Sequence, residues 1–149
     1  MKEAGRVTIS IVIPASVEQV WAELERIEDH VEWMADAVAI EFHSPQRRGI
    51  GTSFSCKTKI GPLATTDEME IDQWVDGQSI GVTHRGAVTG SGAFVLDEIS
   101  PTATKVTWEE RLVFPWYFGG AIGASAARPV FRWIWGRNLR QLSERVTSR

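Results

Sequence analysis

Three ionisable side chains fall on predicted strand faces that are otherwise apolar: Asp67, His84 and Glu110. Alternate residues of a β-strand share one face, and each of these three is two positions from an apolar residue of its own strand. Burial disfavours the charged form, so it raises the pKa of a carboxyl group and lowers the pKa of an imidazole. These residues are therefore candidates for acid–base catalysis, in which a carboxylate or imidazole removes a proton from the carbon beside a carbonyl.

Each of the three also has a purely structural interpretation. Asp67 would be solvated if it lies near the end of its strand, and His84 would be satisfied by neighbours at the rim of the sheet. Glu110 would pair with Arg128 or with an arginine of the first helices. Arg128 itself is expected on the apolar stripe of the last helix, where it would hold the carboxylate of a ligand or extend to solvent. The sequence leaves these alternatives open.

Other reactive residue types give weaker signals. Cys56 is the one cysteine, which excludes an intramolecular disulfide and a multi-cysteine zinc site, and it is expected to be a small buried apolar side chain. His30 and His43 are expected at the surface, and no metal-ligand spacing is present. The glycines of residues 119–123 do not follow the strand that a dinucleotide-binding loop requires, so no cofactor is expected.

Composition and charge favour one globular domain spanning residues 1–149. The chain is 43% hydrophobic and 23% charged, and its net charge of −3 divides into +5 over residues 128–149 and −8 over the remainder. We expect the basic segment to lie against an acidic body, and this balance argues against nucleic-acid binding. The N-terminus has no secretory signal pattern and residues 114–127 are too short to span a bilayer, so a cytoplasmic location is expected.

Alternating hydrophobicity predicts seven strands, most of them joined by connections of hairpin length. In chain order they cover residues 7–13, 37–43, 53–60, 63–74, about 80–82, 86–99 and 104–114. Such short connections make neighbouring strands antiparallel. Gly86, Gly90 and Gly92 within one predicted strand indicate a bend or bulge, so the sheet should be curved.

Helical spacing appears in two places. Ser16 and Gln19 have the form of a capping box at the start of a helix that runs to about residue 29, and a short helix follows over residues 30–34. Near the C-terminus one apolar stripe recurs every three or four residues; it contains Phe131, Trp135, Leu139, Leu142 and Val146. Pro129 either kinks a longer helix that begins near residue 118 or occupies the first position of a new one. This last helix is the only element long enough to cover the sheet.

Four segments together resemble the START-like helix-grip superfamily, also called SRPBCC, and within it the bacterial polyketide cyclase/dehydrase proteins. They are VTISIVIPASVEQVWAELERIEDHVEWM, DEMEIDQWVDGQSIGVTHRG, KVTWEERLVF and RNLRQLSERV. The resemblance implies an α+β fold of the START/Bet-v-1-like kind. In this fold a curved seven-stranded antiparallel sheet grips the long C-terminal helix around a deep apolar cavity, and two short helices follow the first strand.

Members of this superfamily bind lipids, sterols, polyketides or plant hormones, and some are enzymes. We therefore expect a small hydrophobic ligand with a polar end, such as a lipid, fatty acid or polyketide, held between sheet and helix. The aromatic residues would line this cavity or fill it. The residues expected to contact the ligand are Phe54, Met69, Ile71, Val82, His84, Trp108, Glu110, Arg128, Phe131 and Trp135.

Two alternatives remain. The first is a cofactor-free cyclase or dehydratase, which requires at least two of Asp67, His84, Glu110 and Arg128 to converge in the cavity. The second is a peripheral membrane or protein-interaction module, suggested by the aromatic cluster at residues 116–118 and the arginine-rich C-terminal segment. Nothing in the sequence indicates the oligomeric state.

Overall fold

The computed structural model describes residues 5–86 and 88–149 and contains seven strands, three α-helices and two 3₁₀ helices in this part of the chain. In chain order the elements are β1 (Arg6–Ile13), α1 (Val17–Leu24), η1 (Ile27–Asp29), α2 (His30–Trp33), β2 (Ala37–Phe42), β3 (Ser53–Ile60), β4 (Leu63–Val75), β5 (Ser79–Arg85), β6 (Thr89–Ser100), β7 (Ala103–Val113), η2 (Trp116–Phe118) and α3 (Gly120–Thr147).

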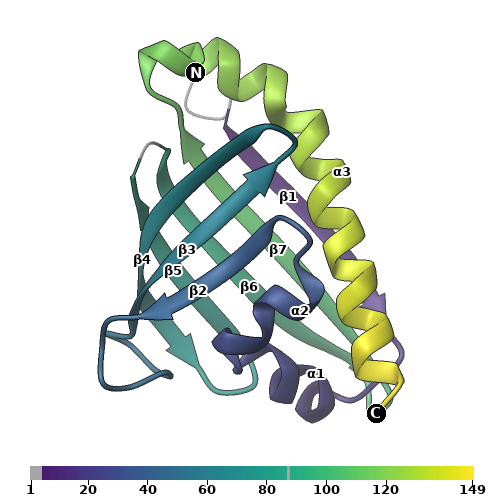
Figure 1. Cartoon of the computed structure of the whole chain (residues 1–149). Helices are drawn as coiled ribbons and strands as arrows, with labels where there is room; N and C mark the ends of the chain where they lie inside the picture. Colours follow the sequence, from purple (N-terminus) through teal and green to yellow (C-terminus); the bar gives the residue numbers. More distant parts are fainter. Residues whose placement is uncertain (1–4, 87) are drawn as a thin grey trace.

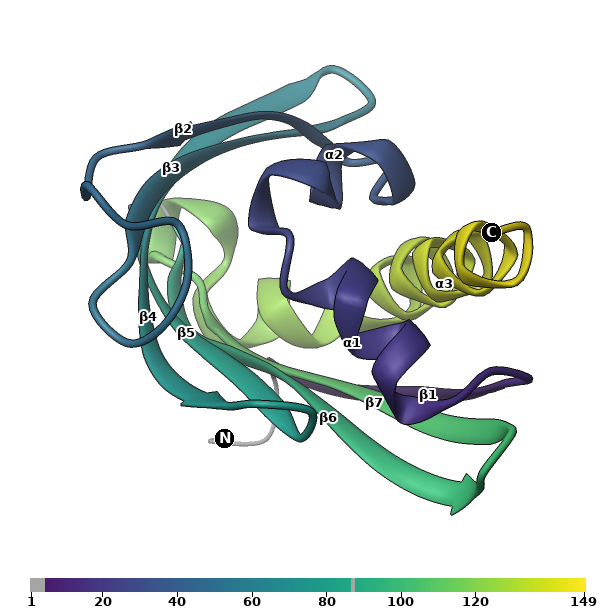
Figure 2. The ribbon, with the colours of Figure 1, turned by 90° about the horizontal axis from the view of Figure 1, so that it is seen from below.

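The seven strands form a single antiparallel sheet in the order β1-β7-β6-β5-β4-β3-β2. Every strand after β2 pairs with its predecessor, while β1 joins the far edge beside β7. The sheet curls so that α1, α2 and α3 lie on its concave side, between the two edge strands (Figure 2). The predicted α+β helix-grip architecture is confirmed, including the two short helices that follow the first strand.

Element boundaries differ from the prediction in a few places. The strand expected over residues 86–99 begins at Thr89, and Gly86 lies in the turn after β5. A Cβ atom on Gly86 would stand 2.5 Å from a carboxylate oxygen of Asp67, so glycine is required by the close approach of this turn to β4. The helix expected from Ser16 to about residue 29 divides into α1 and η1. Its predicted capping box is present, since the Ser16 hydroxyl accepts from the Gln19 backbone N–H.

Residues 1–4 and Ala87 lie outside the described part of the chain. The first four belong to the segment in which no signal pattern was expected, and Ala87 to the predicted strand over residues 86–99. At the other end of the chain, α3 continues through Pro129 as one helix of 28 residues, which decides between the two predicted arrangements. None of the helices in residues 5–86 and 88–149 is both long and apolar enough to cross a membrane.

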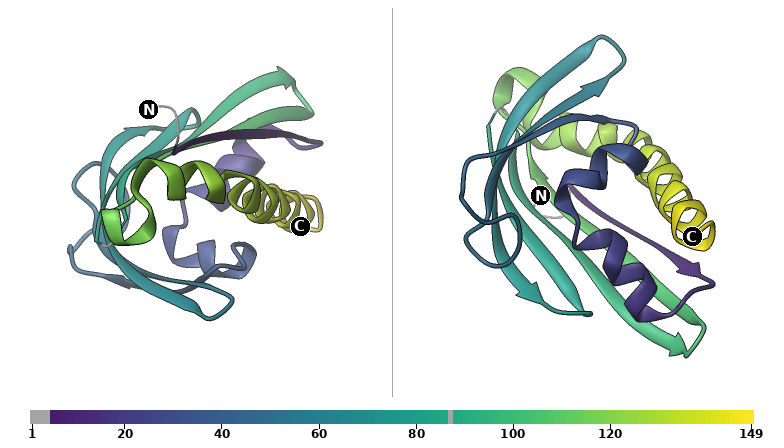
Figure 3. Two further views of the ribbon diagram at one scale, coloured as in Figure 1. Left: turned by 90° about the horizontal axis from the view of Figure 1, so that it is seen from above. Right: turned by 60° about the horizontal axis from the view of Figure 1, so that its bottom comes forward.

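The C-terminal half of α3 is packed against the sheet and the short helices. Its predicted stripe is buried at four positions, namely Trp135, Leu139, Leu142 and Val146. The helix runs along β1 and β7 from the upper end of the molecule to the lower end, where α1 lies (Figure 1). Figure 3 shows from two further directions that α3 follows the open side of the curled sheet. Burial of this stripe is the hydrophobic contribution that holds helix and sheet together.

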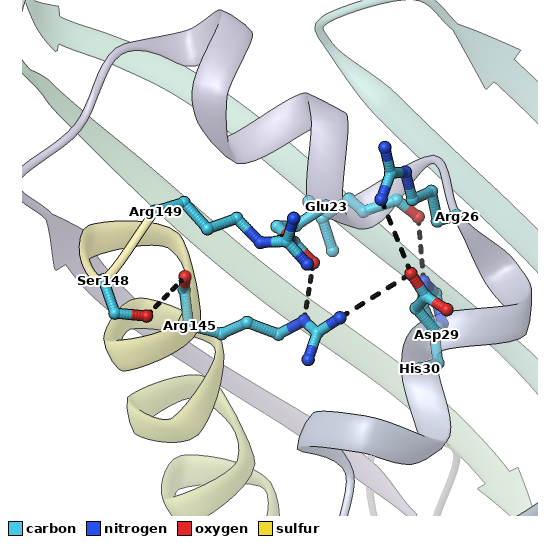
Figure 4. A network of polar contacts seen from close by, with 8 residues as sticks. Glu23, Arg26, Asp29, His30, Arg145, Ser148 and Arg149 are labelled. Atoms are coloured by element: carbon cyan, nitrogen blue, oxygen red, sulfur yellow. Dashed lines mark hydrogen bonds and ion pairs between the residues drawn. The ribbon is translucent and has the colours of Figure 1, made fainter.

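Polar contacts fix the same half of α3 at two points. The fully buried Asn138 accepts from the backbone N–H of Ala35 at 3.0 Å and donates to Asp36 at 2.7 Å. At the C-terminal end, Glu23 of α1 is 3% exposed and accepts from Arg145 Nε at 2.8 Å, and it also pairs with Arg149 (Figure 4). The basic end of the chain therefore lies against acidic residues of the first helices.

We predict that Glu23→Gln lowers the free energy of unfolding by about 1–3 kcal/mol, because a buried carboxylate that holds two guanidinium groups is replaced by a neutral amide. Glu144→Gln is a matched control, because Glu144 is an exposed residue of α3 whose side chain makes no such pair. Urea unfolding followed by circular dichroism measures both variants. Equal midpoints for the two would show that the Glu23 pairs add nothing to stability.

Candidate functional site

A cavity of about 390 Å³ lies between the concave face of the sheet and helix α3. Residues from β2 to β7 line it, together with side chains of α2, η2 and α3. Most of these side chains are apolar. The side chains of the sheet therefore do not fill the space between the sheet and α3 completely.

A wall of four aromatic rings forms one side of this cavity. Phe131 and Trp135 of α3 stack with their ring centroids 4.9 Å apart, and Trp135 stacks on Trp108 of β7 at 5.2 Å. Trp108 in turn contacts Phe94 of β6 at 4.8 Å. The four residues of this aromatic wall line the cavity and bridge helix and sheet at the same time.

Three lining residues that keep exposed surface lie at one end of the molecule. Leu63 is 52% exposed, and Val88 and Phe118 are half-buried. They come from the start of β4, the turn after β5 and η2, all of which lie toward the upper end of the molecule in Figure 1. Trp116 and Tyr117 of η2 are exposed at this end, as the membrane-contact hypothesis requires, and that hypothesis stays a prediction.

The central polar feature of the cavity is a buried pair between strands β5 and β7. His84 Nε2 donates to Glu110 Oε2 at 3.0 Å, and Trp108 Nε1 donates to the other oxygen, Oε1, also at 3.0 Å. Both members of the pair are less than 10% exposed. Each carboxylate oxygen of Glu110 therefore has a charged or polar donor, and this pairing replaces the expected partner Arg128.

A glycine makes this pair possible. His84 and Glu110 stand on either side of β6, where Gly92 is the residue opposite Glu110. A Cβ atom on Gly92 would lie 2.3 Å from Glu110 Oε1, so the carboxylate occupies the space that any other residue would fill. From the sequence, this glycine is expected to contribute only to the curvature of the sheet. Its position also lets a side chain of β7 reach across β6 toward β5.

The pKa values of the site follow from burial and charge. Burial acts to lower the pKa of His84, but the hydrogen bond and charge of Glu110, together with the charge of Asp67, outweigh it and raise the pKa. Burial also raises the pKa of Asp67, against the attraction of His84, and its Oδ1 is buried with no hydrogen-bond partner among the described residues. The expectation that the pKa of His84 is lowered is therefore wrong, because its partner carries the opposite charge.

Most of the expected contact residues line the cavity. They are Phe54, Met69, Val82, His84, Trp108, Glu110, Phe131 and Trp135, and the candidate Asp67 lines it as well. Ile71 does not, since its fully buried side chain belongs to the core where β4 bonds to the segment before β3. The structure brings His84 and Glu110 into hydrogen-bonding contact, which meets the convergence that an enzyme would need.

Arg128 also lies away from the cavity. It lines a separate depression on α3 with Ser125, Pro129 and Arg132. Its expected position assumed regular helical angles. The helix α3 is continuous through Pro129, but its cavity-lining side chains are Phe131 and Trp135, so the turn that carries Arg128 does not face the cavity.

Sequence reasoning missed one histidine of the cavity and placed two other residues correctly. His30 lines the cavity and is buried, and its Nε2 donates to the Leu24 carbonyl at 2.8 Å, so the expected surface position is wrong. Burial lowers the pKa of His30 to about 4, which keeps the ring neutral near pH 7. Its spacing of three residues from the buried Ile27 was the available signal.

His43 is exposed and Cys56 is buried, as predicted; burial raises the pKa of the Cys56 thiol to about 11.

Comparison with known proteins supports the resemblance seen in the sequence. The profile of the family described as polyketide cyclase/dehydrase and lipid transport matches residues 4–147. No curated protein matches the chain. Among solved structures, the Zhui aromatase/cyclase from Streptomyces sp. R1128 is 14% identical, with a TM-score of 0.74, and the match covers 95% of this chain and 93% of that one.

Two further solved structures have the same fold. A START superfamily protein from Mycobacterium smegmatis is 11% identical with a TM-score of 0.77, over 96% of this chain and 97% of that one. A conserved protein from Geobacillus kaustophilus is 15% identical with a TM-score of 0.76, over 96% and 95% of the two chains. At these identities the likeness establishes the fold.

We predict that Gly92→Ala displaces the Glu110 carboxylate and thereby lowers the pKa of His84 below its wild-type value. Glu110→Gln should have the same effect, because it removes the charge that offsets burial. Histidine titration followed by NMR measures both. Gly136→Ala is the control, since a Cβ there meets only the end of Arg140, 3.9 Å away. An unchanged His84 titration in Gly92→Ala would show that the glycine does not shape the pair.

The same pair makes stability depend on pH. Because the folded-state pKa of His84 is raised, its contribution is fully present below the unfolded-state value of about 6.5 and is lost as the pH rises through the folded-state pKa. We therefore predict that the free energy of unfolding, measured by urea denaturation at a series of pH values, falls over this interval in the wild type. In Glu110→Gln this fall should disappear.

Proposed function

Because this chain belongs to the family of polyketide cyclase/dehydrase and lipid transport proteins, we propose that it binds a small apolar molecule with one polar end in the cavity between sheet and α3. The observation that carries this proposal is the hollow of about 390 Å³ beside the aromatic wall. Pockets of this size with apolar walls and a few convergent polar groups are typical of small-molecule sites.

The distribution of polar groups supports the same proposal. His84 lies in β5, Glu110 in β7 and Asp67 in β4. The other residues that line the cavity are mostly aromatic or aliphatic. Burying the apolar body of a ligand would contribute roughly 25 cal/mol per Å² of surface removed from water. The polar groups would then fix its orientation.

We predict that Thr65→Trp abolishes ligand binding by filling the cavity, whereas Thr66→Trp leaves it unchanged. The two threonines are adjacent in β4, but Thr65 lines the cavity and Thr66 is exposed on the other face. The measurement is the fluorescence of N-phenyl-1-naphthylamine, a neutral apolar probe, during titration with each protein. Saturable binding is expected for the wild type and for Thr66→Trp. If the wild type gives no saturable signal, or if Thr65→Trp binds as well as the wild type, the proposed site is wrong.

A second candidate function is a cofactor-free cyclase or dehydratase, and the buried His84–Glu110 pair favours it. A neutral imidazole or a carboxylate in such a site would take a proton from the carbon beside a carbonyl, leaving an enolate that a hydrogen-bond donor stabilises. The structural neighbour from Streptomyces is an aromatase/cyclase. The pair faces the cavity, where a carbonyl compound would be held.

For this second candidate we predict catalysed exchange of the α-protons of benzoylacetone in D₂O, followed by proton NMR. Glu110→Gln should reduce the exchange rate by about 10²-fold or more, the size expected for loss of a positioned acid–base group. The naphthylamine probe should still bind to this variant. Exchange at the uncatalysed rate in the wild type would leave ligand binding as the function.

A further inference from the structure

The ionisable groups that line the cavity are mostly acidic. Asp36, Asp67 and Glu110 contribute three carboxyl groups, and no lysine or arginine lines the cavity within residues 5–86 and 88–149. The two lining histidines do not reverse this balance. His30 is neutral near pH 7, because burial lowers its pKa to about 4, and His84 is paired with Glu110.

Two of the three carboxyl groups already accept hydrogen bonds from side chains of the protein. Both oxygens of Glu110 accept hydrogen bonds, one from His84 and one from Trp108. Asp36 accepts from the buried side chain of Asn138. Glu110 and Asp36 are therefore each held in place by at least one donor of the protein.

Asp67 differs from the other two carboxyl groups. Its side chain lines the cavity, and neither of its carboxylate oxygens has a hydrogen-bond partner among the described residues. Oδ1 is buried against Gly86, where a Cβ atom would lie 2.5 Å away, so a ligand in the cavity would reach this carboxyl group through its other oxygen, Oδ2. A buried acceptor without a donor costs free energy, and a donor brought by a ligand would recover it.

We propose that the polar end of the ligand is a hydrogen-bond donor without negative charge, namely an alcohol, phenol or ammonium group that donates to Asp67. This inference rests on the proposed binding function and narrows its chemistry. A carboxylate in the same place would meet the like charges of the acidic groups, and the imidazole of His84, the cation nearest to them, is already paired with Glu110 in a poorly solvated site, which is unfavourable. Fatty-acid anions are thereby disfavoured, and Arg128, expected to hold such an anion, lines a different depression.

The test compares three probes that share a ten-carbon chain and differ only at the polar end: 1-decanol, decylamine and decanoate. Each is titrated at pH 7 against protein that carries N-phenyl-1-naphthylamine, and displacement is measured. We expect decanol and decylamine to displace the probe at concentrations about tenfold or more below that of decanoate. Decanoate that displaces as well as decanol would overturn the inference and leave the binding function intact. If none of the three binds, by displacement or by native mass spectrometry, the binding function itself fails.

Two variants assign the effect to Asp67. Asp67→Asn keeps the shape of the side chain and removes its charge, so decylamine should bind about tenfold more weakly and the disadvantage of decanoate should shrink. Glu70→Gln removes one carboxylate from the exposed face of the same strand. It should change neither the affinity for decylamine nor the affinity for decanoate. Circular dichroism confirms that both variants fold. If Asp67→Asn and Glu70→Gln give the same affinities, Asp67 does not select the polar end.

Discussion

The aromatic wall is the contact on which the rest of the molecule depends. Phe131 stacks on Trp135, Trp135 stacks on Trp108, and Trp108 packs on Phe94, so the rings bind α3 to strands β7 and β6. Rigid rings in fixed stacking geometry cannot collapse into the space beside them as flexible aliphatic chains would. The wall therefore separates a filled core near α1 and β1 from a hollow near β3 and β4. The indole of Trp108 also donates to Glu110, which connects the wall to the buried polar pair.

Anchoring of α3 is unequal along its length. The C-terminal half is held by its buried apolar stripe, by Asn138 and by the pairs of Glu23. The N-terminal half begins at glycines, contains Pro129 and carries exposed side chains such as Ile122. Local opening requires the least free energy where few buried contacts are lost. The part of the cavity lined by Leu63 and by Phe118 of η2 therefore adjoins the less firmly held half of α3.

The sequence predicts the elements well because they are encoded by local patterns. Alternation identified all seven strands, and it placed Glu110 on the inner face of β7. The partner of Glu110 was not predictable in this way, because it depends on the register of β5, β6 and β7 together, and one residue of slip would turn each side chain to the other face. Gly92 shows the same limit: a glycine in a strand indicates a close approach, and only the three-dimensional register shows that the approaching group is a carboxylate. Arg128 was misplaced because the prediction extended the cavity-facing stripe of α3 one turn before Phe131, and the cavity does not reach that turn.

The chemistry of the cavity depends on which of its acidic residues have a partner in the protein. A His84–Glu110 pair carries no net charge when the imidazole is protonated, so its two members neutralise each other inside the apolar hollow. Asp67 has no equivalent partner, yet it lies close enough for its charge to help raise the pKa of His84. A donor group bound to Asp67 would withdraw part of that influence and thereby change the protonation of the pair. Ligand binding and proton transfer would then be coupled through this one carboxyl group, whichever of the two the protein performs.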